Sequence, residues 1–199
     1  MNHCYKENFE KYDWLIFYDI DEFIHLENFN DIKKFLSQRK FLNCKKIYLN
    51  WLYHTDNDLI EYDNRSLFQR FPIKDPNINK KPYKIPGKSI IRGHIENISF
   101  NNMHILNREL KGCNGFGLKL DDSYLIKNPD FKYYYIDHFY SKSLEEFVEK
   151  LKKGCPNNHH DIKFALFRIK RYFTFNKKNN YKIKYIENKT GIDLKRFYI

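Results

Sequence analysis

Three carboxylates follow the most apolar segment near the start of the chain. The run Trp-Leu-Ile-Phe-Tyr at 14–18 is continuous, rich in strand-forming residues and too short for a buried helix, which predicts an interior β-strand. Asp19, Asp21 and Glu22 come directly after this run. In open α/β sheets the ligand crevice lies at the carboxyl ends of the strands. We therefore expect the three acids to face such a crevice.

Two aspartates in this position are suited to holding a divalent cation. Carboxylate oxygens are the hard ligands that Mg²⁺ and Mn²⁺ prefer, and one or two of them complete an octahedral shell together with phosphate oxygens of a substrate. A cation held in this way neutralises charge on a departing nucleotide diphosphate. Asp19 and Asp21 are therefore the predicted metal ligands.

The Asp-x-Asp spacing alone is a weak signal. The chain has 14 aspartates among 199 residues, so about one such pair is expected by chance. A second pair, Asp56 and Asp58, lies in a segment rich in Asn and Asp. Two solvated loop carboxylates are the simpler explanation of an isolated pair. What distinguishes Asp19 and Asp21 is the apolar strand that delivers them rigidly to the edge of a sheet.

The remaining chain predicts an α/β fold in which helices flank a mixed sheet. Residues 45–54 alternate apolar and other side chains at period two, as a strand does. Four prolines make the segment from 55 to 87 irregular, apart from one helical turn at 66–71. The other expected elements are strands at 88–92 and 132–140, a glycine-rich turn at 112–117, and helices at 31–40, 160–173 and 181–188.

The clearest helix start in the sequence lies shortly after the strand at 132–140. Ser143 and Glu146 have the spacing of a capping box, and apolar residues follow at helical period as far as Leu151. Gly154 is placed to end this helix, because glycine adopts the left-handed conformation common at helix C-termini. Strand, cap and helix therefore agree with one another.

The segment around the acids resembles a known family. Asp19-Ile-Asp-Glu-Phe23 is similar to the Asp-x-Asp-Glu-Phe core of glycosyltransferase family 92 and its bacterial family-2-like relatives. Later segments resemble further motifs of that family in the same order, and the resemblance covers roughly residues 10–155. These segments are Trp51, Gln69-Arg70-Phe71, Lys88-Ser-Ile-Ile91, His104, Asp137-His-Phe-Tyr140 and Lys142-Ser-Leu-Glu-Glu-Phe147, followed by Lys150 and Gly154.

This resemblance implies a partial GT-A-like (Rossmann-like) fold that transfers a sugar from a nucleotide-sugar donor to a glycan or lipid-linked acceptor. It implies Asp19, Asp21 and His138 as the metal-side ligands of Mn²⁺ or Mg²⁺. We expect a glycosyltransferase-like domain over residues 1–175 and a basic C-terminal extension over 176–199. The substrate-binding residues assigned on the same ground are Glu22, Trp51, Arg70, Lys88 and His104.

Several of these residues also have a purely structural interpretation. His138 lies on an aromatic strand, where a histidine is often a hydrogen-bonded core residue. Arg70 and Lys88 would be ordinary surface cations without the family pattern. Trp51 would pack in the core, although aromatic rings also hold sugars.

A catalytic base is not assigned by the sequence. Asp56, Glu109 and Asp121 are the candidates, and choosing among them requires geometry. In the resembled family a nucleotide-binding half precedes the Asp-x-Asp motif, whereas 18 residues precede Asp19 here. We therefore expect the metal-binding and acceptor-side part of a transferase, as a fragment of a longer enzyme or as a non-catalytic remnant.

The charge of the chain suits an anionic partner without identifying it. The formal net charge is +11, with lysines and arginines spread along the whole sequence. A metal-dependent nuclease or nucleotidyltransferase would use the same acids and the same positive charge, and it is the alternative enzyme class. No nucleic-acid-binding module is recognisable, so we expect no nucleic-acid partner.

Cysteine usage and the chain ends predict a cytoplasmic protein. Four widely separated cysteines, without paired short spacing, predict reduced thiols. The N-terminus has no apolar signal region, and no apolar stretch approaches membrane-spanning length. A peripheral membrane contact through the basic segment 163–171 is an alternative to a plain solvated face.

Overall fold

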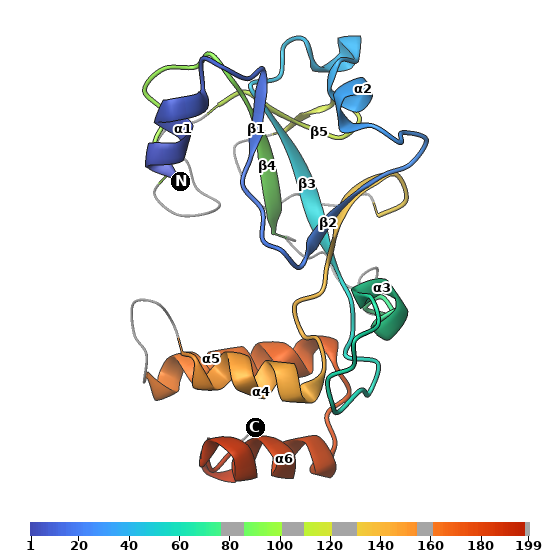
Figure 1. Ribbon diagram of the computed structural model, residues 1–199, viewed down its shortest axis with the longest axis vertical. Helices are drawn as coiled ribbons and strands as arrows, with labels where there is room; N and C mark the ends of the chain where they lie inside the picture. The colour runs from blue at the N-terminus through green and yellow to red at the C-terminus, as the bar shows by residue number, and fades with distance from the viewer. Residues whose placement is uncertain (77–85, 101–109, 121–130, 155–160, 198–199) are drawn as a thin grey trace. The chain divides into compact units, whose positions relative to one another are not determined.

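The computed structural model describes residues 1–76, 86–100, 110–120, 131–154 and 161–197 (Figure 1). The chain divides into two compact units. The sheet unit consists of Met1–Leu52 and Asn79–His138, and the helical unit consists of Tyr53–Ile78 and Phe139–Ile199. The predicted domain boundary after residue 175 does not coincide with this division, because each unit is built from two stretches of chain that are separate in the sequence.

Seven strands within the described residues form a mixed sheet. They are β1 (Trp14–Ile16), β2 (Glu22–Leu26), β3 (Lys46–Tyr53), β4 (Gly87–Arg92), β5 (Gly112–Asn114), β6 (Lys119–Leu120) and β7 (Tyr134–His138). The main path follows the order β1-β4-β3-β5-β6, and β7 pairs with both β3 and β2. The β3–β5 pair is parallel, whereas β1–β4, β3–β4, β5–β6 and β2–β7 are antiparallel. With helices beside it in the chain, this sheet confirms the predicted α/β class.

Strand β3 is the most deeply buried strand of the sheet. Every residue from Ile47 to Tyr53 is buried, so both faces of this strand are covered. On the neighbouring strand, a Cβ at Gly87 would lie 1.9 Å from the carbonyl oxygen of Leu49. Only a residue without a side chain permits this approach. The close β3–β4 pairing then carries Lys88 into the interior opposite Leu49.

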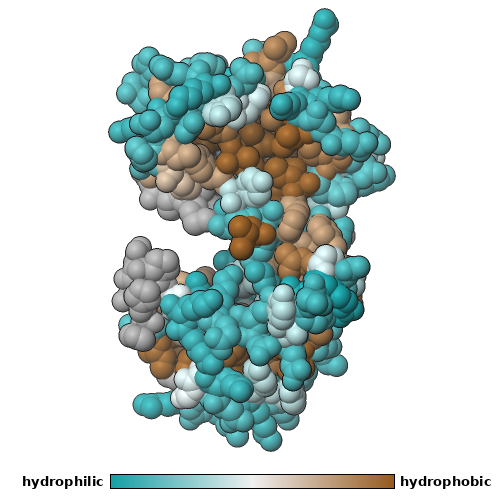
Figure 2. Space-filling view, viewed as in Figure 1, coloured by the Kyte–Doolittle hydropathy of each residue, from teal (hydrophilic) through white to brown (hydrophobic). Residues whose placement is uncertain are grey.

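The first strand is shorter and more exposed than its sequence predicts. The apolar run was expected to form an interior strand, but β1 has three residues, all of them half-buried. It ends the strand order and pairs with β4 alone among the described strands. A groove of about 730 Å³ runs beside it, with Leu15, Ile32 and Leu36 among its lining residues. Figure 2 shows brown, apolar surface in this part of the sheet unit.

Two short helices belong to the sheet unit. They are α1 (Asn2–Asn8) and α2 (Ile32–Leu36), with a 3₁₀ turn η1 (Arg39–Phe41) after α2. Asp31 rather than Asn30 caps α2, because its side chain accepts a 2.7 Å hydrogen bond from the backbone N–H of Lys33. The helix stops well before residue 40, since the chain turns through η1 into β3.

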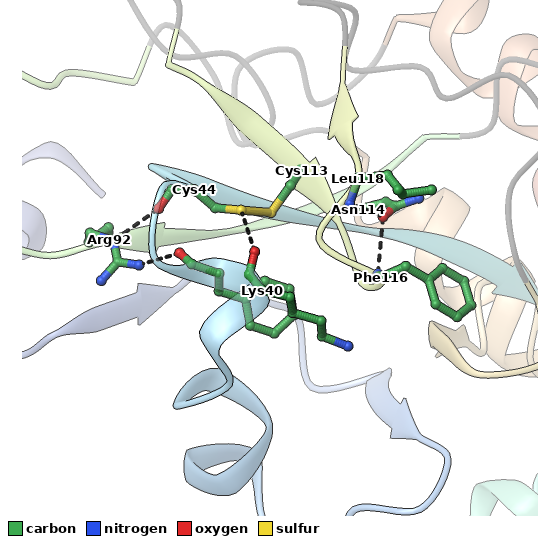
Figure 3. The surroundings of a disulfide bond; sticks show 8 residues. Lys40, Cys44, Arg92, Cys113, Asn114, Phe116 and Leu118 are labelled. Carbon is green, nitrogen blue, oxygen red and sulfur yellow. Dashed lines mark hydrogen bonds between the residues drawn. A yellow bond between two sulfur atoms is a disulfide. The ribbon is translucent and has the colours of Figure 1, made fainter.

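A disulfide bond joins Cys44 and Cys113, so the expectation of reduced thiols is wrong for this pair (Figure 3). It ties the chain just before β3 to the parallel strand β5, and its Cα atoms lie 5.9 Å apart. Arg92 holds the same corner, because its guanidinium donates to the carbonyl oxygens of Phe41 and Cys44 at 2.6 and 2.9 Å. Cys4 is exposed and free.

The helical unit packs its helices around a core of its own. The helices are α3 (Leu67–Arg70), α4 (Leu144–Lys152), α5 (Ile162–Phe175) and α6 (Asn180–Thr190), followed by the 3₁₀ turn η2 (Lys195–Phe197). Their core consists of Leu144, Phe147, Val148, Leu151, Ile169, Tyr172, Ile186 and Leu194. Ile186 and Leu194 lie in the predicted C-terminal extension at 176–199, so this segment is part of the core. No helix in the described ranges is long and apolar enough to cross a bilayer.

Start signals in the sequence are confirmed for two helices of this unit. Ser143 and Glu146 form the predicted capping box of α4, with reciprocal hydrogen bonds of 3.2 and 3.1 Å. Ser66 and Gln69 form a second capping box at α3, where one helical turn was expected. Gly154 follows α4 with a positive φ of 68°, which suits its predicted role at the end of that helix.

Candidate functional site

A tight turn between β1 and β2 presents the acids of the sheet unit. The backbone N–H of Glu22 donates to the carbonyl oxygen of Asp19 at 3.1 Å, and the backbone N–H of Asp19 donates to the Glu22 side chain at 3.2 Å. Asp21 and Glu22 are buried at 8% and 2% exposure, whereas half of the Asp19 side chain is exposed. The turn therefore buries two of its acids and offers the third, Asp19, to solvent.

A buried lysine neutralises part of this charge. The Lys88 side chain is 1% exposed, and its Nζ lies 3.3 Å from Asp19 Oδ2 and 3.5 Å from Glu22 Oε1. Burial of an ammonium group is costly unless acids pair with it, so Lys88 and the two carboxylates depend on one another. The other oxygen of Asp19, Oδ1, has no hydrogen bond within the described residues. It is the carboxylate oxygen best placed to accept a ligand.

Two rings complete the cluster. His138 on β7 lies directly opposite Glu22 on β2, and directly paired residues of antiparallel strands project to the same face. The rings of His138 and Trp51 are 4.6 Å apart between centroids, and Lys88 Nζ lies 5.7 Å from the centroid of Trp51. The structure thus brings five predicted site residues together, namely Asp19, Glu22, Lys88, Trp51 and His138.

The electrostatic state of Glu22 follows from its burial. Desolvation raises the pKa of the Glu22 carboxyl from 4.5 to about 7, although the nearby Lys88 ammonium opposes the shift. Glu22 is therefore divided between its neutral and charged forms near neutral pH. The turn carries three carboxyl groups against one lysine side chain, and this excess of acids favours a bound cation.

The predicted metal ligands do not form a closed metal centre. In the part of the chain that the structure describes, no group of three or more His, Cys, Asp or Glu side chains is arranged to hold an ion. A magnesium-type ion on a diphosphate needs only one or two carboxylates, because phosphate oxygens and waters complete its shell. Asp19, with its open Oδ1 and half-exposed side chain, fits that role; the second predicted ligand, Asp21, is buried.

Arg70 lies in the helical unit and has structural partners there. Its side chain is 6% exposed, and Nη1 donates to Glu146 Oε2 at 2.7 Å. The guanidinium also lies 4.9 Å from the ring centroids of Tyr62 and Phe71. Arg70 therefore links α3 to the start of α4 inside this unit, and its predicted substrate contact stays a prediction.

Asp56, a candidate base, also lies in the helical unit, at the centre of a buried network. Its Oδ2 accepts from the Tyr172 hydroxyl, and Lys182 Nζ lies 2.6 Å from the same oxygen. Burial and the Asp56 carboxylate raise the pKa of Tyr172 well above its ordinary value, so its hydroxyl remains a donor. Lys182 Nζ also contacts Asp58 Oδ1 at 2.6 Å. A carboxylate engaged in this way stabilises the interior of its unit.

Three predicted site residues lie outside the described residues: His104, Glu109 and Asp121. The residues themselves gave no signal for the ion pairs made by Lys88, since the lysine stands 69 positions from Asp19 in the sequence. Only the resemblance singled out Lys88, as a substrate contact. Its burial between two acids is a finding of the structure.

Comparison with known proteins provides no assignment. No protein-family model, no curated protein and no solved structure matches the chain. Function is therefore inferred from the described residues and from the motif resemblance.

Proposed function

We propose that the chain is the metal-binding and acceptor-side part of a glycosyltransferase with a GT-A-like fold. It would move a sugar from a nucleotide-sugar donor to a glycan or lipid-linked acceptor. The observation that carries this proposal is the turn at 19–22. There the half-exposed Asp19 side chain keeps its Oδ1 open, while Lys88 Nζ contacts its Oδ2 at 3.3 Å. Such a turn combines rigidity with access, and a phosphate-bound cation requires both.

Each residue of the cluster has a role in this proposal. Asp19 holds Mn²⁺ or Mg²⁺ through Oδ1, and Asp21 lies beside it as the second carboxylate. The bound cation supplies charge neutralisation to the departing diphosphate. Lys88 and Glu22 fix the turn, because their ion pair and the hydrogen bond from Asp19 N–H restrict its conformation. Trp51 and His138 pack against each other beside the turn, and their predicted roles, substrate contact for Trp51 and metal-side ligand for His138, belong to the same proposal.

The base that would activate an acceptor is not among the cluster residues just described. Asp56 is engaged by Lys182 and Tyr172. Glu109 and Asp121 therefore stay as the predicted candidates for the catalytic base.

The disulfide bears on the cellular location of the protein, because disulfides persist mainly in oxidising compartments. The disulfide therefore counts against the predicted cytoplasmic location, and the peripheral membrane contact stays a prediction.

The direct test is sugar release or transfer from a panel of UDP-, GDP- and CMP-sugars with Mn²⁺. We expect Asp19→Ala and Asp21→Ala to abolish turnover, because each removes a carboxylate from the cation. Asp13→Ala is the matched control, since Asp13 is an exposed acid of the same unit. Turnover that survives both substitutions would disprove the metal assignment.

A second candidate is a non-catalytic protein derived from a transferase. The observation that favours it is the ion pair of Lys88 with both Asp19 and Glu22, because an internal ammonium already neutralises part of the acid charge. This candidate predicts no turnover with any donor, together with retained binding of an acceptor glycan. The nuclease alternative predicts instead binding to DNA or RNA that falls steeply with salt.

A further inference from the structure

Helix α5 gathers positive charge without neutralising acids. Its 14 residues include Lys163, Arg168, Lys170 and Arg171 and no Asp or Glu. Lys163 and Lys170 are exposed, whereas Arg168 and Arg171 are half-buried. Within the described residues, neither arginine has a carboxylate within ion-pair distance. Burying two such guanidinium groups next to one another is unfavourable unless an anion joins them.

The acids of the adjacent helix α4 are engaged with other groups. Glu145 accepts from the backbone N–H of Tyr62 at 2.8 Å. Glu146 pairs with Arg70 at 2.7 Å, and Glu149 pairs with Lys152 at 2.8 Å. Each acid of α4 therefore has another partner, and none forms an ion pair with Arg168 or Arg171.

Two cations contact the ring of Tyr140, and a third acts on its hydroxyl at longer range. Lys150 Nζ lies 4.7 Å and Arg171 Cζ 4.8 Å from the centroid of that ring. Arg168 contributes at longer range, because it and Arg171 both lower the pKa of the Tyr140 hydroxyl against the larger effect of burial, which raises it. The hydroxyl therefore stays protonated at neutral pH and is able to donate to an anion.

Both guanidinium groups are held in place and still have unused donors. Arg171 Nη2 donates to the Tyr53 hydroxyl at 2.7 Å, and Tyr53 stacks on Phe175 with 4.2 Å between ring centroids. Arg168 Nη1 donates to the carbonyl oxygens of Lys150 and Gly154 at 3.0 and 3.3 Å, at the end of α4. Neither arginine has a buried nitrogen without a hydrogen-bond partner among the described residues, so the remaining N–H groups face solvent.

We propose that Tyr140, Lys150, Arg168 and Arg171 form a phosphate-binding site in the helical unit. Planar guanidinium groups bind phosphate oxygens in pairs, and preorganised ones lose little entropy on binding. A phosphate with two negative charges matches a cluster of three cations better than a single carboxylate does. The site is independent of the metal-dependent turn, and its ligand is a phosphate group on either a soluble molecule or a lipid headgroup.

The test is calorimetric titration of the full chain with inorganic pyrophosphate in EDTA, so that no metal contributes. Arg171→Gln should weaken binding by about tenfold or more, because it removes a charged donor to the anion. Lys163→Gln, an equal loss of charge at an exposed position of the same helix, should leave the affinity within about twofold of wild type. Equal losses in both variants would show diffuse charge attraction and overturn the proposal.

Three further measurements remove ambiguity. Far-UV circular dichroism checks that Arg171→Gln is folded, and Arg171→Lys keeps the charge but should still lose about half of the binding free energy gained from paired donors. Asp19→Asn should bind pyrophosphate like wild type, which separates this site from the proposed transferase site. Cosedimentation with phosphatidylcholine vesicles, with and without phosphatidic acid, distinguishes a lipid headgroup from a soluble phosphate. Absence of binding to both pyrophosphate and phosphatidic acid would refute the site.

Discussion

The two Asp-x-Asp pairs of this chain have different surroundings although they have the same spacing. Asp56 is buried in the helical unit, where Lys182 and Tyr172 both contact one of its oxygens. Asp19 in the sheet unit also meets a buried lysine, Lys88, but at 3.3 Å and with half of its side chain exposed. Each pair thus has a buried lysine and one exposed aspartate, which is Asp58 in the helical unit. The difference lies in the buried acid beside it, because Asp56 meets its lysine at 2.6 Å whereas Glu22 lies 3.5 Å from Lys88.

This difference shows what separates a structural acid from a ligand-binding one. The buried Asp56 network satisfies each of its members, and it joins the 56–58 loop to α5 and α6. In the sheet unit the buried acid next to Lys88 is Glu22. Burial raises its pKa to about 7, because the Lys88 ammonium offsets only part of the cost of burying the charged carboxylate. A carboxyl with a raised pKa next to an exposed carboxylate is more typical of a functional site than of a structural ion pair.

The largest expected effect is at the buried lysine of the helical unit. Lys182→Met should lower the free energy of unfolding by about 3–5 kcal/mol, because it leaves Asp56 buried without its cation. Urea denaturation followed by circular dichroism at the helical band measures the loss. Lys88→Met is the matched change in the sheet unit and should cost less, since Asp19 is half-exposed and Glu22 readily takes up a proton. A loss under about 1 kcal/mol for Lys182→Met would contradict the structural role of this network.

Removal of the disulfide should come next in size. Cys44→Ser with Cys113→Ser opens a loop of 69 residues and should cost about 4 kcal/mol in the sheet unit, where the Asp19 turn resides. The same denaturation, with tryptophan fluorescence as the probe, is suitable because both tryptophans lie in this unit. Cys4→Ser is the control, and equal stability of all three proteins would show that the two thiols are not joined.

The pH dependence of stability should distinguish Glu22 from exposed acids. Because the folded protein holds the Glu22 proton up to about pH 7 and the unfolded chain releases it near pH 4.5, stability from this group falls as pH rises between these values. The expected difference is about 3 kcal/mol between wild type and Glu22→Gln across this range, in metal-free buffer. Glu27→Gln, at an exposed position, should follow wild type. Parallel pH curves for Glu22→Gln and wild type would refute the burial of this carboxyl.

Local features of the fold were predictable from the sequence. The capping box of α4 depends on residues within one helical turn, so spacing identifies it. Strand β3 was recognised because its apolar residues alternate over eight positions. Helix α1 and strand β2 were missed, since their sequences carry more charged and polar residues than a core element usually has.

Long-range pairings were not predictable. The disulfide joins cysteines 69 positions apart, and the Asp56–Lys182 ion pair spans 126 positions. Neither is encoded by a local pattern, because each depends on how strands and helices pack. The same limit explains the arginines of α5, where composition indicated a basic helix but not the ring of Tyr140 beside it. Candidate site residues therefore came from the resemblance, and their grouping came from the fold.

Binding of Mn²⁺ in the presence of UDP tests the central comparison most directly, with the free ion counted by electron paramagnetic resonance. The ion should bind to wild type and to Asp58→Ala, which removes the exposed acid of the second pair. Asp19→Ala should lower the affinity by about tenfold or more, because the open carboxylate oxygen is lost. Equal Mn²⁺ affinity in Asp19→Ala and wild type, or a loss in Asp58→Ala alone, would contradict the assignment of the cation to the sheet unit.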